Sequence, residues 1–254
     1  MKYILSCVVA AALVAGIGFG VNFLDEQPTK QAQKQEIIAE THEIRKEDVA
    51  FETENPIVYE ALLTLEETWN KLDKLEQDGV NIGNCKNDVV TLMTFVRETG
   101  KKIKVEQVEI PGQTLNCVET VVYSADTDKG GQVTAAAGIA SFKEILSGEN
   151  ANNYDADGTE QNAIKHTKWS AVATILTKDT MYTKYFTDAH EYGHPANFDN
   201  EANYKDSEMD LKNNDLGREI GEKLYPEGKL TALNKLNDEI EKAKEQGRFT
   251  VIKK

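Results

Sequence analysis

The sequence NPIVYEALLTLEETWNKLDKLEQDG, residues 55–79, is the clearest fold signal in the chain, because its apolar residues recur at helical spacing. Pro56 suits the first turn of a helix, and Gly79 suits the position just after its last turn. The apolar positions form one stripe: Val58, Leu62, Leu65, Trp69, Leu72 and Leu75. The stretch therefore predicts an amphipathic helix of about 20 residues that packs one face on a core.

Patterns further along the chain complete the expected fold. Residues 88–98 and 135–146 have helical character, whereas residues 102–110 alternate and residues 118–123 are rich in β-branched side chains, as strands are. Four more helices are expected over residues 159–177, 179–191, 207–224 and 230–246. The sequence thus predicts a mainly α protein with a mixed α+β middle region and a helical C-terminal domain.

The N-terminal 24 residues have the composition of a membrane-associated segment. After Lys2, residues 3–24 contain no charged side chain. About 20 apolar residues suffice for a membrane-spanning helix, and a cleaved signal peptide gives a similar pattern. Residues 1–24 are therefore expected to form an N-terminal apolar helix, as a signal peptide or membrane anchor. Since the positive charge precedes the apolar run, the bulk of the chain would be exported, as a secreted, periplasmic or membrane-anchored protein.

The net charge narrows the class of partner. The chain has 29 Lys and Arg residues against 43 Asp and Glu residues, a formal net charge of −14. Because binding to phosphates needs a basic surface, nucleic acid is not an expected partner. The expected partners are the membrane, through the N-terminal segment, and a protein or another component of the cell envelope.

Composition also divides the chain into regions. Residues 25–55 are polar and acidic, which is typical of a spacer. A polar run at residues 149–158 favours a boundary between a helical or mixed domain, 56–150, and a helical domain, 151–254, that carries the candidate site. Export would favour a disulfide between Cys85 and Cys117. In a reducing compartment the same residues would be small buried thiols.

Three polar blocks in the C-terminal region hold the residues best suited to chemistry. They are Asn162, Lys165, His166 and Trp169; then Asp188-Ala189-His190-Glu191; and then Met209-Asp210-Leu211-Lys212-Asn213-Asn214, continuing to Gly217-Arg218. In this order the blocks resemble an uncharacterised bacterial domain family found in exported and toxin-like proteins, over residues 159–224. Lys165 stands where the family usually has Arg. The resemblance implies no established activity.

The residue types in these blocks suit hydrolysis. A histidine beside a carboxylate is an oriented general base, and neighbouring amides can hold a developing oxyanion. We expect catalytic roles for His166, His190, Glu191 and Asp210, with water as the nucleophile because the blocks hold no Ser or Cys. The expected substrate-binding residues are Lys165, Trp169, Asp188, Asn213, Asn214 and Arg218. In the alternative interpretation, these side chains form a buried polar network that holds the helices in register.

A metal-binding pattern overlaps the second block. His190-Glu191-x-x-His194 fits the H-E-x-x-H motif, in which two imidazoles one helical turn apart bind zinc. A divalent metal such as zinc is therefore the cofactor to consider, with His190 and His194 as ligands. Gly193 and Pro195 argue against this motif, because they predict that the helix ends before His194.

The leading interpretation is an exported or surface-anchored protein with a hydrolase-like or toxin-like effector domain. A non-enzymatic interaction module of the cell envelope is the first alternative, and a zinc-dependent metallopeptidase is the second.

Overall fold

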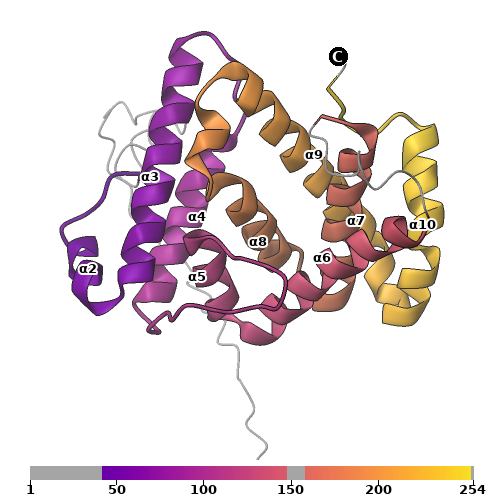
Figure 1. Ribbon diagram of the computed structural model, residues 1–254, viewed down its shortest axis with the longest axis horizontal. Helices are drawn as coiled ribbons and strands as arrows, with labels where there is room; N and C mark the ends of the chain where they lie inside the picture. The colour runs from indigo at the N-terminus through magenta and orange to yellow at the C-terminus, as the bar shows by residue number, and fades with distance from the viewer. Residues whose placement is uncertain (1–41, 148–157, 253–254) are drawn as a thin grey trace, which may run out of the picture.

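The computed structural model describes residues 42–147 and 158–252, and every regular element in these two ranges is a helix (Figure 1). The α-helices are α2 (Phe51–Glu54), α3 (Pro56–Gln77), α4 (Cys85–Gly100), α5 (Cys117–Ala125), α6 (Thr127–Ser147), α7 (Glu160–Thr177), α8 (Thr180–Tyr192), α9 (Glu201–Leu224) and α10 (Lys229–Glu245). Short 3-10 turns span Asp48–Ala50, Pro195–Phe198 and Tyr225–Glu227. The prediction of a mainly α protein is confirmed.

The mixed α+β middle region is wrong, since residues 118–123 lie in α5. Asn116 caps this helix: its side-chain oxygen accepts from the Glu119 backbone N–H at 2.9 Å, and the Glu119 carboxylate accepts from the Asn116 N–H at 2.8 Å. Val118, Val121 and Val122 are fully buried on the inner face. The reciprocal cap and this burial outweigh the weak strand preference of a β-branched run.

Residues 102–110 also form no strand. The only bridge in the described parts of the chain is an isolated one between Ile110 and Gln113. The segment is held instead by Asn55, whose amide donates to the Ile103 carbonyl at 2.9 Å and accepts from the Val105 N–H at 3.0 Å. A single side chain thus satisfies backbone groups that a partner strand would otherwise satisfy.

The N-terminal predictions fall largely on residues that the structure does not describe. The apolar helix expected for residues 1–24 lies outside the described ranges, so the structure lends it no support. Within residues 42–147 and 158–252, no helix is both long enough and apolar enough to cross a membrane.

The described end of the expected acidic spacer, residues 42–55, is packed against the rest of the protein. Arg97 Nε donates to buried Asp48 Oδ2 at 2.8 Å, and Arg97 Nη2 donates to the Glu43 carbonyl at 2.8 Å. The Phe51 side chain is buried in the core. The spacer therefore does not extend through residues 42–55.

Helix α7 lies at the centre of the C-terminal half, where it packs against α6, α8, α9 and α10 (Figure 1). Its contact with α9 is the closest, because Gly217 and Gly221 on α9 face it. A Cβ atom at Gly217 would lie 2.3 Å from the Thr167 carbonyl oxygen, and one at Gly221 would lie 2.6 Å from the Thr174 Cβ. These two glycines let the α9 backbone approach α7 directly. A side chain larger than hydrogen at Gly217 would prevent this close approach.

One hydrophobic core contains residues from both predicted domains. The cluster runs from Phe51 to Ala243, and it includes side chains of α6 as well as of α7. Helices α6 and α7 also pack directly against each other. The described residues on the two sides of the predicted boundary at residue 150 therefore share a single core.

The disulfide expected between Cys85 and Cys117 is absent, and both cysteines are free thiols. Cys85 Sγ lies 3.9 Å from the Tyr204 hydroxyl, whereas Cys117 Sγ lies 3.4 Å from the Thr64 hydroxyl. Each sulfur thus has its own polar neighbour. Burial raises the pKa of both thiols, which keeps them in the unreactive protonated form.

Candidate functional site

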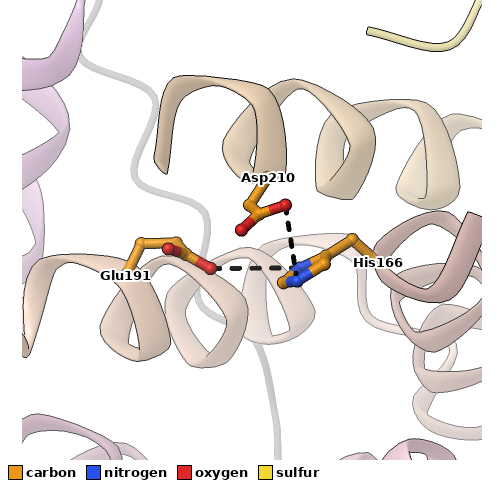
Figure 2. A group of neighbouring side chains, drawn as sticks. All are labelled: His166, Glu191 and Asp210. Atoms are coloured by element: carbon orange, nitrogen blue, oxygen red, sulfur yellow. Dashed lines mark ion pairs between the residues drawn. The ribbon is translucent and has the colours of Figure 1, made fainter. Parts of the chain in front are cut away.

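His166, Glu191 and Asp210 converge from three different helices, α7, α8 and α9 (Figure 2). His166 Nε2 lies 3.5 Å from Asp210 Oδ1, and His166 Nδ1 lies 3.9 Å from Glu191 Oε1. All three side chains are largely buried. One side-chain N or O atom from each lies within 4.8 Å of the others, so the three residues could together hold a metal ion. The sequence predicted all three as catalytic, and the structure brings them together.

Two hollows in the surface adjoin these side chains, and both are lined by Lys165, His166 and His190. The larger has a volume of about 530 Å³ and polar walls that include Glu191 and Asp210. The smaller has a volume of about 260 Å³ and a more apolar lining, with Trp169 at one side. We call the larger one the polar cleft and the smaller one the apolar pocket. A substrate in either would contact His166 and His190.

Local capping fixes the ends of the helices that carry the site. Thr159 caps α7, Asp179 caps α8 and Asn200 caps α9, each by accepting backbone N–H groups with its side chain. Asn162, in the first turn of α7, donates from Nδ2 to Asp210 Oδ1 at 3.2 Å. Asn162 therefore orients the carboxylate of Asp210. The sequence analysis had placed Asn162 in a motif without giving it a role.

His190 is held by Glu119, a residue that the sequence analysis missed. His190 Nδ1 lies 2.9 Å from Glu119 Oε1, while the other oxygen of Glu119 accepts from the Asn116 N–H. Glu119 is buried, and the His190 side chain is 44% exposed. The Asn116-x-x-Glu119 capping box is the signal that could have revealed a helix start here. The capping box could not have shown that the first turn of α5 lies against α8.

Trp169 forms one wall beside the two histidines. Its ring meets the His190 ring edge-on at a centroid distance of 5.2 Å and lies 6.2 Å from the His166 ring. The indole N–H donates to the buried Val133 carbonyl at 3.1 Å. Trp169 is thereby fixed in position, with its ring available to the apolar pocket.

Burial and nearby charges shift the pKa values of Glu191 and His190. Burial raises the pKa of the Glu191 carboxyl above its usual range, and the neighbouring His190 acts in the opposite direction. For His190, burial lowers the pKa, but the hydrogen bond with Glu119 and the charges of Glu191 and Asp210 outweigh this and raise it to about 9. The cluster therefore combines a histidine that holds its proton with a buried carboxyl group, Glu191, whose neutral form is favoured by burial.

Four of the expected substrate-binding residues have structural partners instead. Asp188 Oδ2 accepts from Lys184 Nζ at 2.5 Å, and Asp188 Oδ1 lies 3.7 Å from Arg218 Nη1. Asn213 bonds the backbone of Thr250 in both directions, at 2.8 and 3.1 Å.

The fourth of these residues, Asn214, accepts from Ser170 Oγ at 2.8 Å across the interface of α7 and α9. None of the four residues lines the polar cleft or the apolar pocket. Lys165 and Trp169 do line the apolar pocket, and their substrate-binding roles stay a prediction.

The H-E-x-x-H pattern does not form a helical pair of ligands. Helix α8 ends at Tyr192, as Gly193 and Pro195 indicated, and His194 is exposed beyond it. The rings of His190 and His194 lie 6.1 Å apart and nearly perpendicular. Within the described residues, the one group of three close potential metal ligands contains Glu191 but neither of these histidines.

Comparison with known proteins finds one family model that matches part of the chain. Residues 134–244 match the model of a family described as a domain of unknown function (DUF6973). The match includes α7, α8 and α9, and therefore His166, Glu191 and Asp210. The resemblance to a family without established activity is thus confirmed for this segment. No curated protein and no solved structure matches the chain.

Proposed function

We propose that this protein is a hydrolase whose reaction takes place in the polar cleft. The observation that carries the proposal is the convergence of His166, Glu191 and Asp210 beside an open cavity of about 530 Å³. Buried ionisable groups cost free energy unless they are paired, so a cluster of them next to solvent is typical of a functional site. No serine, threonine or cysteine is needed as a nucleophile if these groups activate water.

The geometry suggests separate roles for the side chains of the cleft. His166 lies between the two carboxylates, with Asp210 at Nε2 and Glu191 at Nδ1, and these groups would orient a water molecule at the cleft and accept its proton. His190 stands at the junction of the two hollows with Glu119 behind it. With its proton retained, His190 suits electrostatic stabilisation of a developing oxyanion or proton donation to a leaving group. Lys165 would attract a negatively charged part of the substrate.

A non-enzymatic interaction module is the second candidate function, and the buried network favours it. Asp188, Asn213, Asn214 and Arg218 are buried with internal partners, so much of the polar motif stabilises the fold. In this interpretation His166, Glu191 and Asp210 would belong to the same network. The two candidates differ in what substitution of the cleft carboxylates does to stability.

We also propose that the protein acts outside the cytoplasm as a surface-anchored or secreted effector, of the kind found among toxin-like proteins. The uncharged run of residues 3–24 supports this location. Full-length protein expressed in a bacterial host should be recovered in the membrane or extracytoplasmic fraction. A version lacking residues 2–24 should stay in the cytoplasm. Cytoplasmic recovery of both would contradict export.

The hydrolase proposal predicts activity that depends on Asp210. The purified protein should hydrolyse at least one substrate from a panel of chromogenic esters, phosphate esters and fluorogenic peptides. D210N keeps the size of the side chain but removes its charge, so the rate should fall by about 100-fold or more. K212A, which removes an exposed lysine paired only with Glu208, should retain the rate. Equal activity of D210N and the parent protein would refute this assignment, and no hydrolysis of any substrate class would favour the interaction module.

A further inference from the structure

We propose that His166, Glu191 and Asp210 bind a divalent first-row transition-metal cation, with zinc or manganese as the best fit to the donor set. One imidazole nitrogen and two carboxylate oxygens from three helices make a mixed nitrogen and oxygen site. Imidazole favours transition metals over Mg²⁺ and Ca²⁺, while the carboxylates also suit Mn²⁺. This site uses neither His190 nor His194, so it differs from a site built on the H-E-x-x-H pattern.

An unsatisfied buried oxygen is an independent observation that points to a ligand. Glu191 is 4% exposed, and its Oε1 atom has no hydrogen-bond partner within the described residues. His166 Nδ1 lies 3.9 Å from this oxygen, beyond hydrogen-bond distance. A buried carboxylate oxygen without a partner is costly, and a bound cation removes that cost.

The distances are close to those of a metal centre. Ligand atoms at 2.0–2.2 Å from a tetrahedral cation lie about 3.4 Å from each other. His166 Nε2 and Asp210 Oδ1 are already 3.5 Å apart. Glu191 faces the other nitrogen of His166, so binding would draw its carboxylate toward Asp210 through a change of side-chain torsion angles. The helices themselves need not move.

The surroundings suit a cation with an open coordination position. Asn162 donates to Asp210 Oδ1 and so orients this carboxylate, as residues around a metal centre commonly do. The polar cleft adjoins the three residues, and water or substrate can reach the remaining positions.

A catalytic role for this cation rests on the proposed hydrolase function. A cation at this point would lower the pKa of a bound water molecule, so that hydroxide becomes available at neutral pH. Cation binding and hydrolysis are nevertheless separate measurements, and either can fail without the other.

Isothermal titration calorimetry of the full chain, after treatment with a chelator and dialysis, tests the site directly. Zn²⁺ or Mn²⁺ should bind at one ion per chain, and Mg²⁺ should bind far more weakly. D210N and E191Q should each weaken binding by about 100-fold or more, and N162A by about tenfold, since it removes only an orienting contact. H194A is the matched control, and it should leave the affinity unchanged.

Circular dichroism of each variant establishes that it is folded before titration, and D210N and E191Q preserve side-chain volume for this reason. Unsaturable binding, full affinity in both carboxylate variants, or loss of binding in H194A would overturn the metal site. Hydrolysis that survives complete chelation would refute a catalytic role for the cation while leaving the hydrolase proposal intact. One bound cation without hydrolysis would leave the site intact and refute the hydrolase.

Discussion

G217A should lower the free energy of unfolding by about 3 kcal/mol, near the upper end of the usual cost of overpacking. A Cβ atom at this position would lie 2.3 Å from the Thr167 carbonyl oxygen and 2.8 Å from the Ser170 Cβ. The nearest obstacle is backbone, so a change of rotamer cannot relieve the clash. Helices α7 and α9 would have to separate. Urea denaturation followed by circular dichroism measures the loss.

G138A is the matched control for this substitution. Gly138 also lies within a helix, α6, but it is exposed and a Cβ atom there would meet nothing within 4 Å. Alanine is the better helix former, so G138A should stabilise the protein by up to about 1 kcal/mol. If the two variants shift stability by the same amount and in the same direction, close packing at Gly217 is not what holds α7 to α9.

The close approach of α9 to α7 at Gly217 also affects the candidate functional site. Thr167, which Gly217 contacts, follows His166 in α7, while Asp210 precedes Gly217 by two helical turns. The separation between α7 and α9 thus sets the distance between His166 and Asp210. We expect G217A to weaken function as well as stability, because a wider gap moves these two side chains apart.

Helices with a clear apolar stripe or a recognisable cap could be predicted from the sequence. The stripe in residues 55–79 corresponds to α3, and the expected helix of residues 159–177 corresponds to α7 with Thr159 as its cap. The prediction for residues 118–123 is wrong because a short run rich in β-branched residues suits a strand or a buried helix equally well. The Asn116-x-x-Glu119 capping box is present in the sequence, but no helix was predicted from it.

The candidate site was predictable in its chemistry but not in its arrangement. His166, Glu191 and Asp210 were identified because their side chains can bind protons or metals. The amides of Asn213 and Asn214 share a helical face with Asp210 in sequence, yet they face α7 and the C-terminal segment. Glu119 comes from outside the three blocks altogether. Which side of a helix faces a cavity depends on tertiary packing, and helical periodicity alone does not determine it.

Substitution of two buried acids on α8, Asp188 and Glu191, distinguishes the functional from the structural interpretation. The hydrolase proposal predicts that one substitution lowers stability and the other lowers the rate of hydrolysis. Asp188 contacts Lys184 and Arg218 away from the polar cleft, whereas Glu191 lines that cleft; each of the two carboxylates also has one oxygen without a hydrogen-bond partner. D188N should destabilise the protein by about 2 kcal/mol, because it removes the buried carboxylate that lies between Lys184 and Arg218 and leaves these cations only their more exposed partners, Asp88 and Asp215. E191Q removes a buried charge that lacks a good partner, so its stability should stay within about 1 kcal/mol of the parent.

Activity should respond to these two substitutions in the reverse order. E191Q should lower the rate of hydrolysis by about 100-fold or more while the protein remains folded, since the lost charge belongs to the reacting centre. D188N, measured well below its unfolding temperature, should keep most of the rate, since Asp188 does not line the cleft. Urea denaturation and initial rates on the same preparations provide both readouts. A loss of stability in E191Q as large as that in D188N would place Glu191 in the structural network, because removal of a charge costs stability only where that charge has a stabilising partner.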